Sequence, residues 1–107
     1  MTVYISNAFS LSMISAPTTL TVVEASVEDV KNILNQGFTS AVGHEATSKI
    51  ISTQLGIQVP TNRVSIKLSA GDVLIVYQLL TRLPEGKILS EDEMRQMPAK
   101  WYVVTLQ

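Results

Sequence analysis

Apolar residues recur along the chain with two spacings, and each spacing predicts one kind of secondary structure. Alternating or continuous β-branched and aromatic runs predict five strands, over residues 3–5, 19–23, 63–68, 73–80 and 101–106. In the third run Val64, Ile66 and Leu68 alternate with polar residues, as in a strand with one wet face. The fourth run is nearly all apolar, which predicts a central strand covered on both faces.

Two segments have the i, i+3, i+4 spacing of amphipathic helices, and a capping box predicts a third, short helix. The first begins after the N-cap Ser26 and stops near Gly37. The second covers residues 46–55, and the third begins with a capping box at Ser90 and stops before Pro98. Strands and helices are interleaved without regular alternation. We therefore expect an α/β fold, with a mixed sheet of about five strands flanked by short helices.

Composition limits the domain count and the chemistry. The chain has 107 residues, of which 46% are hydrophobic, so residues 1–107 are expected to form one domain. It contains no cysteine, which excludes disulfide scaffolds, thiol nucleophiles and zinc sites built on cysteine. One histidine excludes a histidine-rich metal site within one chain. We therefore expect no metal ligands.

Charge and hydropathy limit the partners and the location. Eight Lys and Arg against nine Asp and Glu give a net charge of −1, so no broad basic face for long nucleic acid is expected. No continuous apolar run approaches the roughly 18–20 residues of a membrane span. The N-terminus lacks the basic region of a signal peptide. A cytoplasmic location away from membranes is the expectation.

Polar residues gather at three element ends, where loops commonly carry function. The first cluster contains Asn7 and Ser10, directly after the first strand. Both are also ordinary turn residues, so alone they do not distinguish a binding site from a simple turn.

The second cluster contains Gly43, His44 and Thr47, where the second helix begins. Unpaired N–H groups and a partial positive charge at a helix N-terminus suit a phosphate. A bound phosphate would favour the protonated imidazole of His44, so the ligand itself would charge a general acid. A cap, or a buried histidine bonded to a carbonyl, would give the same pattern.

The third cluster runs from Gln78 through Arg82 and Glu85 to Lys87. Arginine offers a planar fork of donors to a phosphate and lysine a point charge. A solvated surface loop with an ion pair worth about 0–1 kcal/mol is the alternative.

Four segments together resemble one family. They are Asn7-Ala8-Phe9-Ser10, Gly43-His44-Glu45-Ala46-Thr47, Asn62-Arg63-Val64 and Arg82-Leu83-Pro84-Glu85-Gly86-Lys87. Their order and spacing resemble the small ring-nuclease family first seen in archaeal viruses and also found in bacteria and their prophages. In viruses that family acts as an anti-CRISPR.

The resemblance implies a metal-independent phosphodiesterase with no cofactor, acting as a homodimer on cyclic tetra-adenylate. Opening the ring gives linear di-adenylates with 2′,3′-cyclic phosphate ends and switches off type III CRISPR signalling. His44 is then the proton donor, Arg82 stabilises phosphate charge, and Glu85 orients the 2′-hydroxyl or His44. The substrate-binding residues implied are Asn7, Ser10, Gly43, Thr47, Arg63, Gln78 and Lys87.

One departure from the family pattern concerns the middle motif, which usually reads Gly-His-Asp-Ser-Thr. Here Glu45 and Ala46 replace the Asp and Ser, and losing the hydroxyl affects affinity more than chemistry. Two other classes of function fit the residues alone. One is a binding module that sequesters a cyclic nucleotide or regulates another nucleic acid without turnover. The other is a structural protein in which all three clusters are turns and caps.

Overall fold

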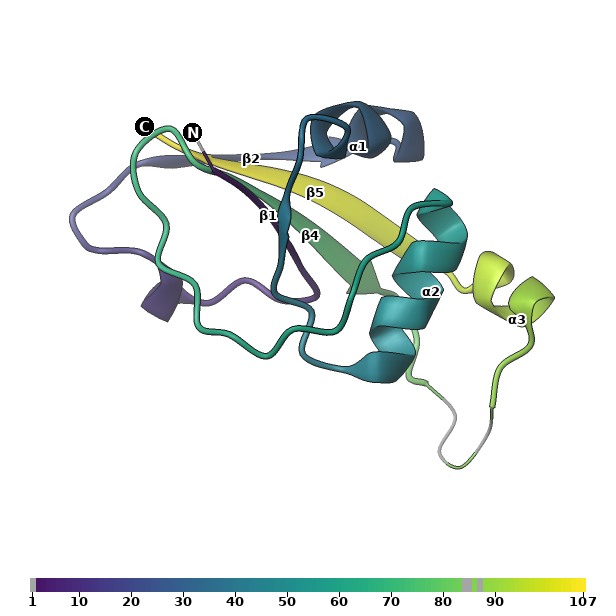
Figure 1. The fold of residues 1–107 in the computed structure, drawn as a ribbon. Coiled ribbons are helices and arrows are strands. Elements are labelled where there is room, and N and C mark those ends of the chain that lie inside the picture. Colours follow the sequence, from purple (N-terminus) through teal and green to yellow (C-terminus); the bar gives the residue numbers. More distant parts are fainter. Residues whose placement is uncertain (1, 84–85, 87) are drawn as a thin grey trace.

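The fold is a five-stranded sheet with three short α-helices, seen here in a computed structural model that describes residues 2–83, 86 and 88–107 (Figure 1). The strands are β1 (Val3–Ser6), β2 (Leu20–Ala25), β3 (Thr39–Ser40), β4 (Val73–Leu79) and β5 (Ala99–Leu106). The helices are α1 (Val27–Leu34), α2 (Glu45–Leu55) and α3 (Glu91–Gln96), with a 3-10 turn, η1, at Leu11–Met13.

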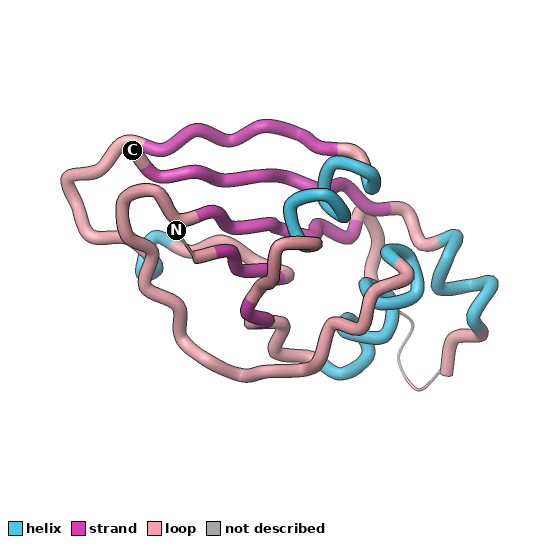
Figure 2. The backbone as a smooth tube through the Cα atoms, turned by 45° about the horizontal axis from the view of Figure 1, so that its top comes forward, coloured by secondary structure: helices cyan, strands magenta, loops and turns pink. Residues whose placement is uncertain are grey.

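The sheet is mixed, with strand order β2-β5-β4-β1-β3 (Figure 2). β1 pairs in parallel with both β3 and β4, whereas β5 runs antiparallel to β2 and β4. The expected mixed α/β sheet of about five strands is confirmed. β4 is the middle strand, as its nearly continuous apolar sequence predicted.

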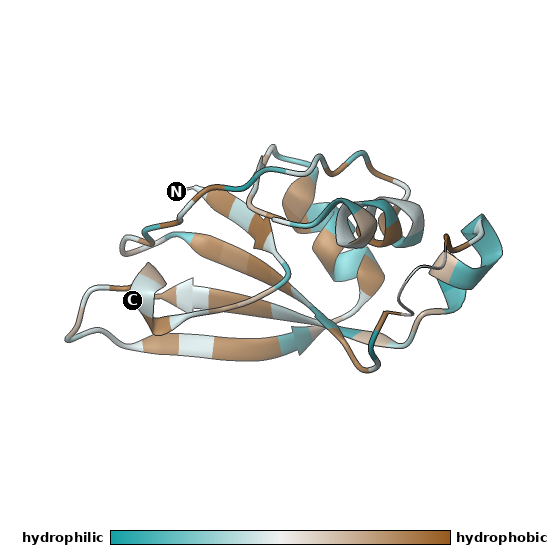
Figure 3. Cartoon of the chain, turned by 90° about the horizontal axis from the view of Figure 1, so that it is seen from below, coloured by the Kyte–Doolittle hydropathy of each residue, from teal (hydrophilic) through white to brown (hydrophobic). Residues whose placement is uncertain are grey.

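One face of the sheet packs against the helices. Val30 and Leu34 of α1 and Ile50, Ile51 and Leu55 of α2 form one cluster with buried side chains of the three strands β1, β4 and β5. Tyr77 and Trp101 lie in this cluster with ring centroids 4.5 Å apart and planes tilted by 58°. α3 has no buried residue and contacts α2, and Figure 3 shows its hydrophilic colouring against the brown of the strands.

The other face of the sheet is covered by irregular chain. Ile66 and Leu68 pack there against Leu74, Val76 and Val104, and Phe9 and Met13 add to the cluster from the segment after β1. Strand β4 therefore has apolar cover on both faces.

The predicted strand over residues 63–68 is wrong, because that segment crosses the sheet instead of joining it. Ile66 and Leu68 are buried as predicted, but Val64 is 49% exposed. The backbone N–H of Leu68 bonds to the Met13 carbonyl in η1. Alternation of apolar and polar residues shows only that one side of a segment is buried and the other faces water. An extended segment that lies across a sheet face has the same alternation without pairing to a neighbouring strand. The fifth strand is the two-residue β3 instead.

The predicted helix ends are confirmed within a few residues. Ser26 and Ser90 each cap a helix, and each makes a capping box, with Asp29 and Glu93. α2 stops at Gly56, which takes a left-handed φ of 66° that a residue with a Cβ disfavours. These local signals fix where α1 and α3 begin and where α2 ends.

Truncating a core side chain of α2 should destabilise the whole fold. Ile51 is fully buried, so Ile51→Ala is expected to lower the free energy of unfolding by about 2–5 kcal/mol. Ile88, 95% exposed, is the matched control, and Ile88→Ala should change it by less than about 0.5 kcal/mol. Urea unfolding followed by circular dichroism measures both, and equal losses would contradict the assigned core.

Candidate ligand-binding site

The topology brings the three polar clusters to one end of the sheet. β3, β1 and β4 are neighbours and run parallel, so their carboxyl ends lie at the same edge. Asn7 follows β1, Gly43 and His44 follow β3, and Gln78 and Arg82 lie at the end of β4 and just beyond it. The crevice at the carboxyl ends of parallel strands is where open α/β sheets bind ligands.

His44 is the N-cap residue of α2 and has extended backbone angles, φ −127° and ψ 129°. Its side chain is exposed, and within the described part of the chain it makes no capping hydrogen bond to the helix. The carbonyl of His44 accepts from the Ser48 N–H, which starts the helical ladder. The N–H groups of the first turn are thus left for a ligand or water. The imidazole is therefore exposed at a helix N-terminus, and is not buried against a carbonyl.

Arg63 lies beside His44 although the two are far apart in sequence. Its Nε donates to the Gly43 carbonyl at 2.8 Å. Arg63, Gly43 and His44 line a hollow of about 410 Å³, together with Val64 and Ser65. The Arg63–Gly43 bond thus fixes a guanidinium next to an imidazole at a helix N-terminus, an arrangement suited to an anionic ligand.

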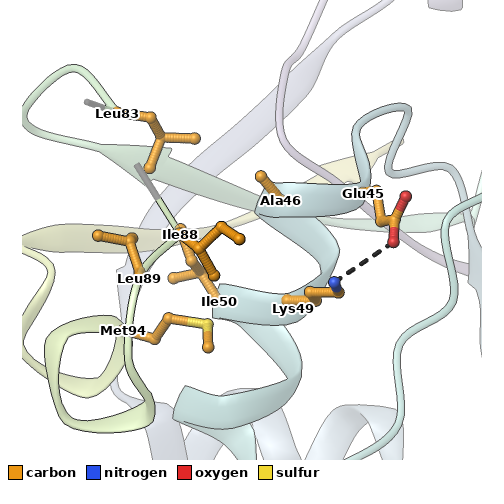
Figure 4. Close-up of a pocket in the computed structure, with 8 residues that line it drawn as sticks. All are labelled: Glu45, Ala46, Lys49, Ile50, Leu83, Ile88, Leu89 and Met94. Carbon is orange, nitrogen blue, oxygen red and sulfur yellow. Dashed lines mark ion pairs between the residues drawn. The ribbon is translucent and has the colours of Figure 1, made fainter. Parts of the chain in front are cut away.

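A second hollow, of about 420 Å³, lies on the other side of the α2 N-terminus. Glu45, Ala46 and Ile50 of α2 face Leu83 and Ile88 across it, and Lys49 pairs with Glu45 at 3.3 Å on its rim (Figure 4). Leu83 directly follows Arg82, so the segment after β4 meets the start of α2 here. Glu85 and Lys87, which belong to the same predicted cluster, lie outside the described residues.

The remaining predicted site residues differ in whether their side chains are free for a ligand or already bonded or buried within the chain. The Ser10 hydroxyl accepts from the Ser12 N–H and caps η1, so it is used locally. Asn7 is half-buried after β1, and the exposed Gln78 amide donates to the Leu79 carbonyl. Thr47 is buried, so its side chain is not exposed to a ligand at the site.

Two polar residues hold this arrangement together: Ser40, which the sequence did not single out, and Asn62, which appeared only as part of the Asn62-Arg63-Val64 segment. The Ser40 hydroxyl donates to the Pro60 carbonyl at 2.6 Å, and the Asn62 amide donates to the Ser40 carbonyl at 2.7 Å. The Asn62 N–H also bonds to the Val42 carbonyl. These bonds attach residues 60–62 to β3 and to the chain that follows it. They set Arg63 against Gly43.

Other candidate chemistry is sparse. Among the described residues no group of three or more His, Asp or Glu side chains could hold a metal ion. Burial, only partly offset by the Gln54 amide, raises the pKa of Tyr77 to about 12. That phenol lies in the helix-side core, among buried apolar side chains. No helix in the described segments is long and apolar enough to cross a membrane.

Comparison with known proteins places the chain in a family. Residues 3–101 match the family described as STIV B116-like. The chain belongs to the STIV B116-like family. A solved structure of this type, B116 of Sulfolobus turreted icosahedral virus, aligns over 98% of this chain and 99% of B116 with a TM-score of 0.85 and 32% sequence identity. The five-stranded α/β fold is thus shared along nearly the whole chain.

Relatives of this STIV B116-like protein occur in archaeal viruses and in a bacterium. Protein 26 of a Sulfolobus islandicus filamentous virus is 42% identical over 76 residues, covering 69% of this chain and 64% of that protein. ORF117 of Acidianus two-tailed virus is 40% identical over 67 residues, covering 60% and 57%. YddF of Bacillus subtilis is 25% identical over 68 residues, covering 64% and 63%. The aligned part is thus below two thirds of each relative. The expected link to a small archaeal-virus family is confirmed.

Proposed function

We propose that this STIV B116-like protein is a metal-independent ring nuclease that opens cyclic tetra-adenylate. It would act in the cytoplasm and silence type III CRISPR signalling, as an anti-CRISPR or a self-limiting device. The observation that carries the proposal is the exposed His44 imidazole at the α2 N-terminus, with no capping bond within the described residues and with Arg63 lining the same hollow. The motif resemblance supplies the substrate.

The proposed chemistry needs few protein groups because RNA carries its own nucleophile. The ribose 2′-hydroxyl attacks the adjacent phosphorus, the P–O5′ bond breaks, and a 2′,3′-cyclic phosphate remains. His44 in its protonated form gives its proton to the departing 5′-oxygen, and the proton of the 2′-hydroxyl passes to Glu85 or to water. Holding attacking and leaving oxygens in line contributes several kcal/mol by itself.

The negative charge on the phosphate would be stabilised by the cationic side chains and N–H groups at the same end of the sheet. Arg82 is exposed just beyond β4, and Arg63 is fixed by its bond to Gly43. The free N–H groups of the first turn of α2 add donors that need no reorientation. Asn7 and Gln78 are the carboxamides available to adenine or ribose edges.

A homodimer completes the proposal. Each chain has one histidine, whereas a symmetric four-membered ring presents equivalent phosphates on opposite sides. A two-fold axis through the ring centre would set one His44 at each of two opposite phosphates. Two di-adenylates follow from two cuts.

Turnover separates this proposal from sequestration. Uniformly labelled cyclic tetra-adenylate is incubated with the protein in excess EDTA, and the products are separated by chromatography. A ring nuclease returns linear di-adenylate. A sequestering module retains the ring during filtration but returns it intact on denaturation, and that result would overturn the enzymatic proposal.

Restoring the family hydroxyl at position 46 should tighten ring binding. Ala46 is exposed in the first turn of α2, so Ala46→Ser can add one hydrogen bond to the ligand. The expected gain is about 2–10-fold in Kd. Titration calorimetry on a His44→Ala background measures it without turnover, with Ala70→Ser, exposed in a remote loop, as the control. Unchanged or weaker binding would contradict the assigned position of the ring.

A further inference from the structure

Arg63 is an exposed arginine whose position is nevertheless fixed by its neighbours. Its Nε donates to the Gly43 carbonyl at 2.8 Å, and its two Nη nitrogens have no hydrogen-bond partner within the described residues. The Val64 N–H bonds to the Asn62 carbonyl at 3.1 Å, which makes Arg63 the central residue of a three-residue γ-turn. The guanidinium is therefore held by one nitrogen and offers the other two to the hollow that it lines.

Asn62 anchors this turn to the chain beside it. Its backbone N–H bonds to the Val42 carbonyl at 2.8 Å, and its side-chain amide donates to the Ser40 carbonyl at 2.7 Å. Carbonyls two residues apart in an extended chain point to the same side, so Asn62 bonds to both from one position. Asn62 itself does not line the hollow. Any effect that it has on a ligand there must therefore act through Arg63, the next residue.

We propose that Asn62 is a positioning residue for the candidate site: it holds the Arg63 guanidinium against Gly43, with the Nη groups already in place for an anion. An exposed arginine that rotates freely loses conformational freedom when a ligand fixes it. Here that loss is incurred when the chain folds, so the same contacts give tighter binding. Once the anion is bound, the guanidinium has the same position with or without the Asn62 amide. Asn62 should therefore affect affinity and leave the rate of the bound state unchanged.

Ser52 provides a matched control, because it attaches the same segment to a different neighbour. Its hydroxyl donates to the Val59 carbonyl at 3.2 Å and accepts from the Val59 N–H at 2.9 Å. Ser52 and Asn62 are both partly buried, and each makes two bonds across the segment that contains residues 59–62. Only Asn62 is adjacent to Arg63. Ser52→Ala therefore tests whether any weakening of this segment has the effect expected of Asn62→Ala.

NMR of the arginine Nε–H groups tests the position of Arg63 without any nucleotide. The chain has three arginines, and Arg63→Lys identifies the Arg63 signal by its loss. In the wild type this N–H should exchange slowly with water, because it is bonded to a carbonyl. Asn62→Ala should lose that protection and Ser52→Ala should keep it. Rapid exchange in the wild type, undiminished protection in Asn62→Ala, or an equal loss in Ser52→Ala would overturn the proposal.

The effect on cyclic tetra-adenylate rests on the proposed function, whereas the position of Arg63 does not. Asn62→Ala should raise the Kd for the ring by about 3–10-fold. The single-turnover rate with saturating protein should stay at the wild-type value, a split that general destabilisation would not produce. In an Arg63→Ala background, Asn62→Ala should change the Kd no further, because the group that it positions is gone.

The two measurements separate failure of this proposal from failure of the proposed function. A wild-type protein that binds no ring would contradict the proposed function alone, since the Nε–H exchange still decides the role of Asn62. Where the ring does bind, an equal Kd for the wild type and Asn62→Ala would overturn the positioning role. A further loss of affinity from Asn62→Ala in the Arg63→Ala background would overturn it as well.

Discussion

His44→Ala should reduce the single-turnover rate of ring opening by about 10²–10⁴-fold while changing ring affinity by only a few-fold. The reason is that the imidazole acts on the leaving oxygen in the transition state and adds little to ground-state binding. Its exposed side chain makes no capping bond within the described residues, so its removal should leave α2 intact. Rapid-quench assays with protein in excess over labelled ring measure the rate, and titration calorimetry measures the affinity.

His44→Asn is the matched control for the helix. Asparagine is a favoured N-cap residue but cannot donate a proton as an acid. The single-turnover rate of His44→Asn should therefore be as low as that of His44→Ala. Its midpoint of thermal unfolding should be at least as high as that of the wild type. Equal single-turnover rates for the wild type and His44→Ala would remove the general acid from the proposal.

Arg82→Ala should impair both binding and turnover, which distinguishes its role from that of His44. A guanidinium on the phosphate interacts with charge in the ground state and more strongly with the added charge of the phosphorane. Losing one such group typically costs about 10²–10³-fold in rate. The same rapid-quench and calorimetric measurements apply, with Arg82→Lys expected to recover part of the affinity.

Lys31→Ala provides the charge-matched control for Arg82. Lys31 is on α1, where it pairs with Glu28 at 3.9 Å, so removing it changes net charge by the same amount away from the site. Its rate and affinity should match the wild type. A full-rate Arg82→Ala enzyme would remove Arg82 from the proposed site, and an equal loss in Lys31→Ala would mean that only overall charge matters.

Local signals in the sequence predicted most of the fold. N-caps at Ser26 and Ser90 and the stop at Gly56 use contacts within one turn, and those contacts survive in the structure. Residues 63–68 were mispredicted because alternation records burial on one side, whatever does the burying. The bounds of β3 could not be predicted, because its two residues, Thr39 and Ser40, are too few to give a measurable period.

The sequence predicted some residues of the candidate site but not the residues that position them. His44 and Arg82 stood out because a titratable or cationic residue at an element end has no role in a core. The structural roles of Ser40 and Asn62 did not, since their bonds join residues 20 and 22 positions apart and leave no local pattern. The Thr47 side chain turned inward because the third residue of α2 faces the core at helical spacing with Ile50 and Ile51.

The chemical ends of the product test the central claim most directly. Mass spectrometry of single-turnover products formed in excess EDTA distinguishes the routes, because attack by the ring's own 2′-hydroxyl gives a di-adenylate of half the ring mass. The proposal predicts this 2′,3′-cyclic phosphate product from the wild type, and its near absence from His44→Ala over the same time. A first product heavier by one water, carrying a 5′-phosphate and a free 3′-hydroxyl, would contradict internal attack and the role given to His44.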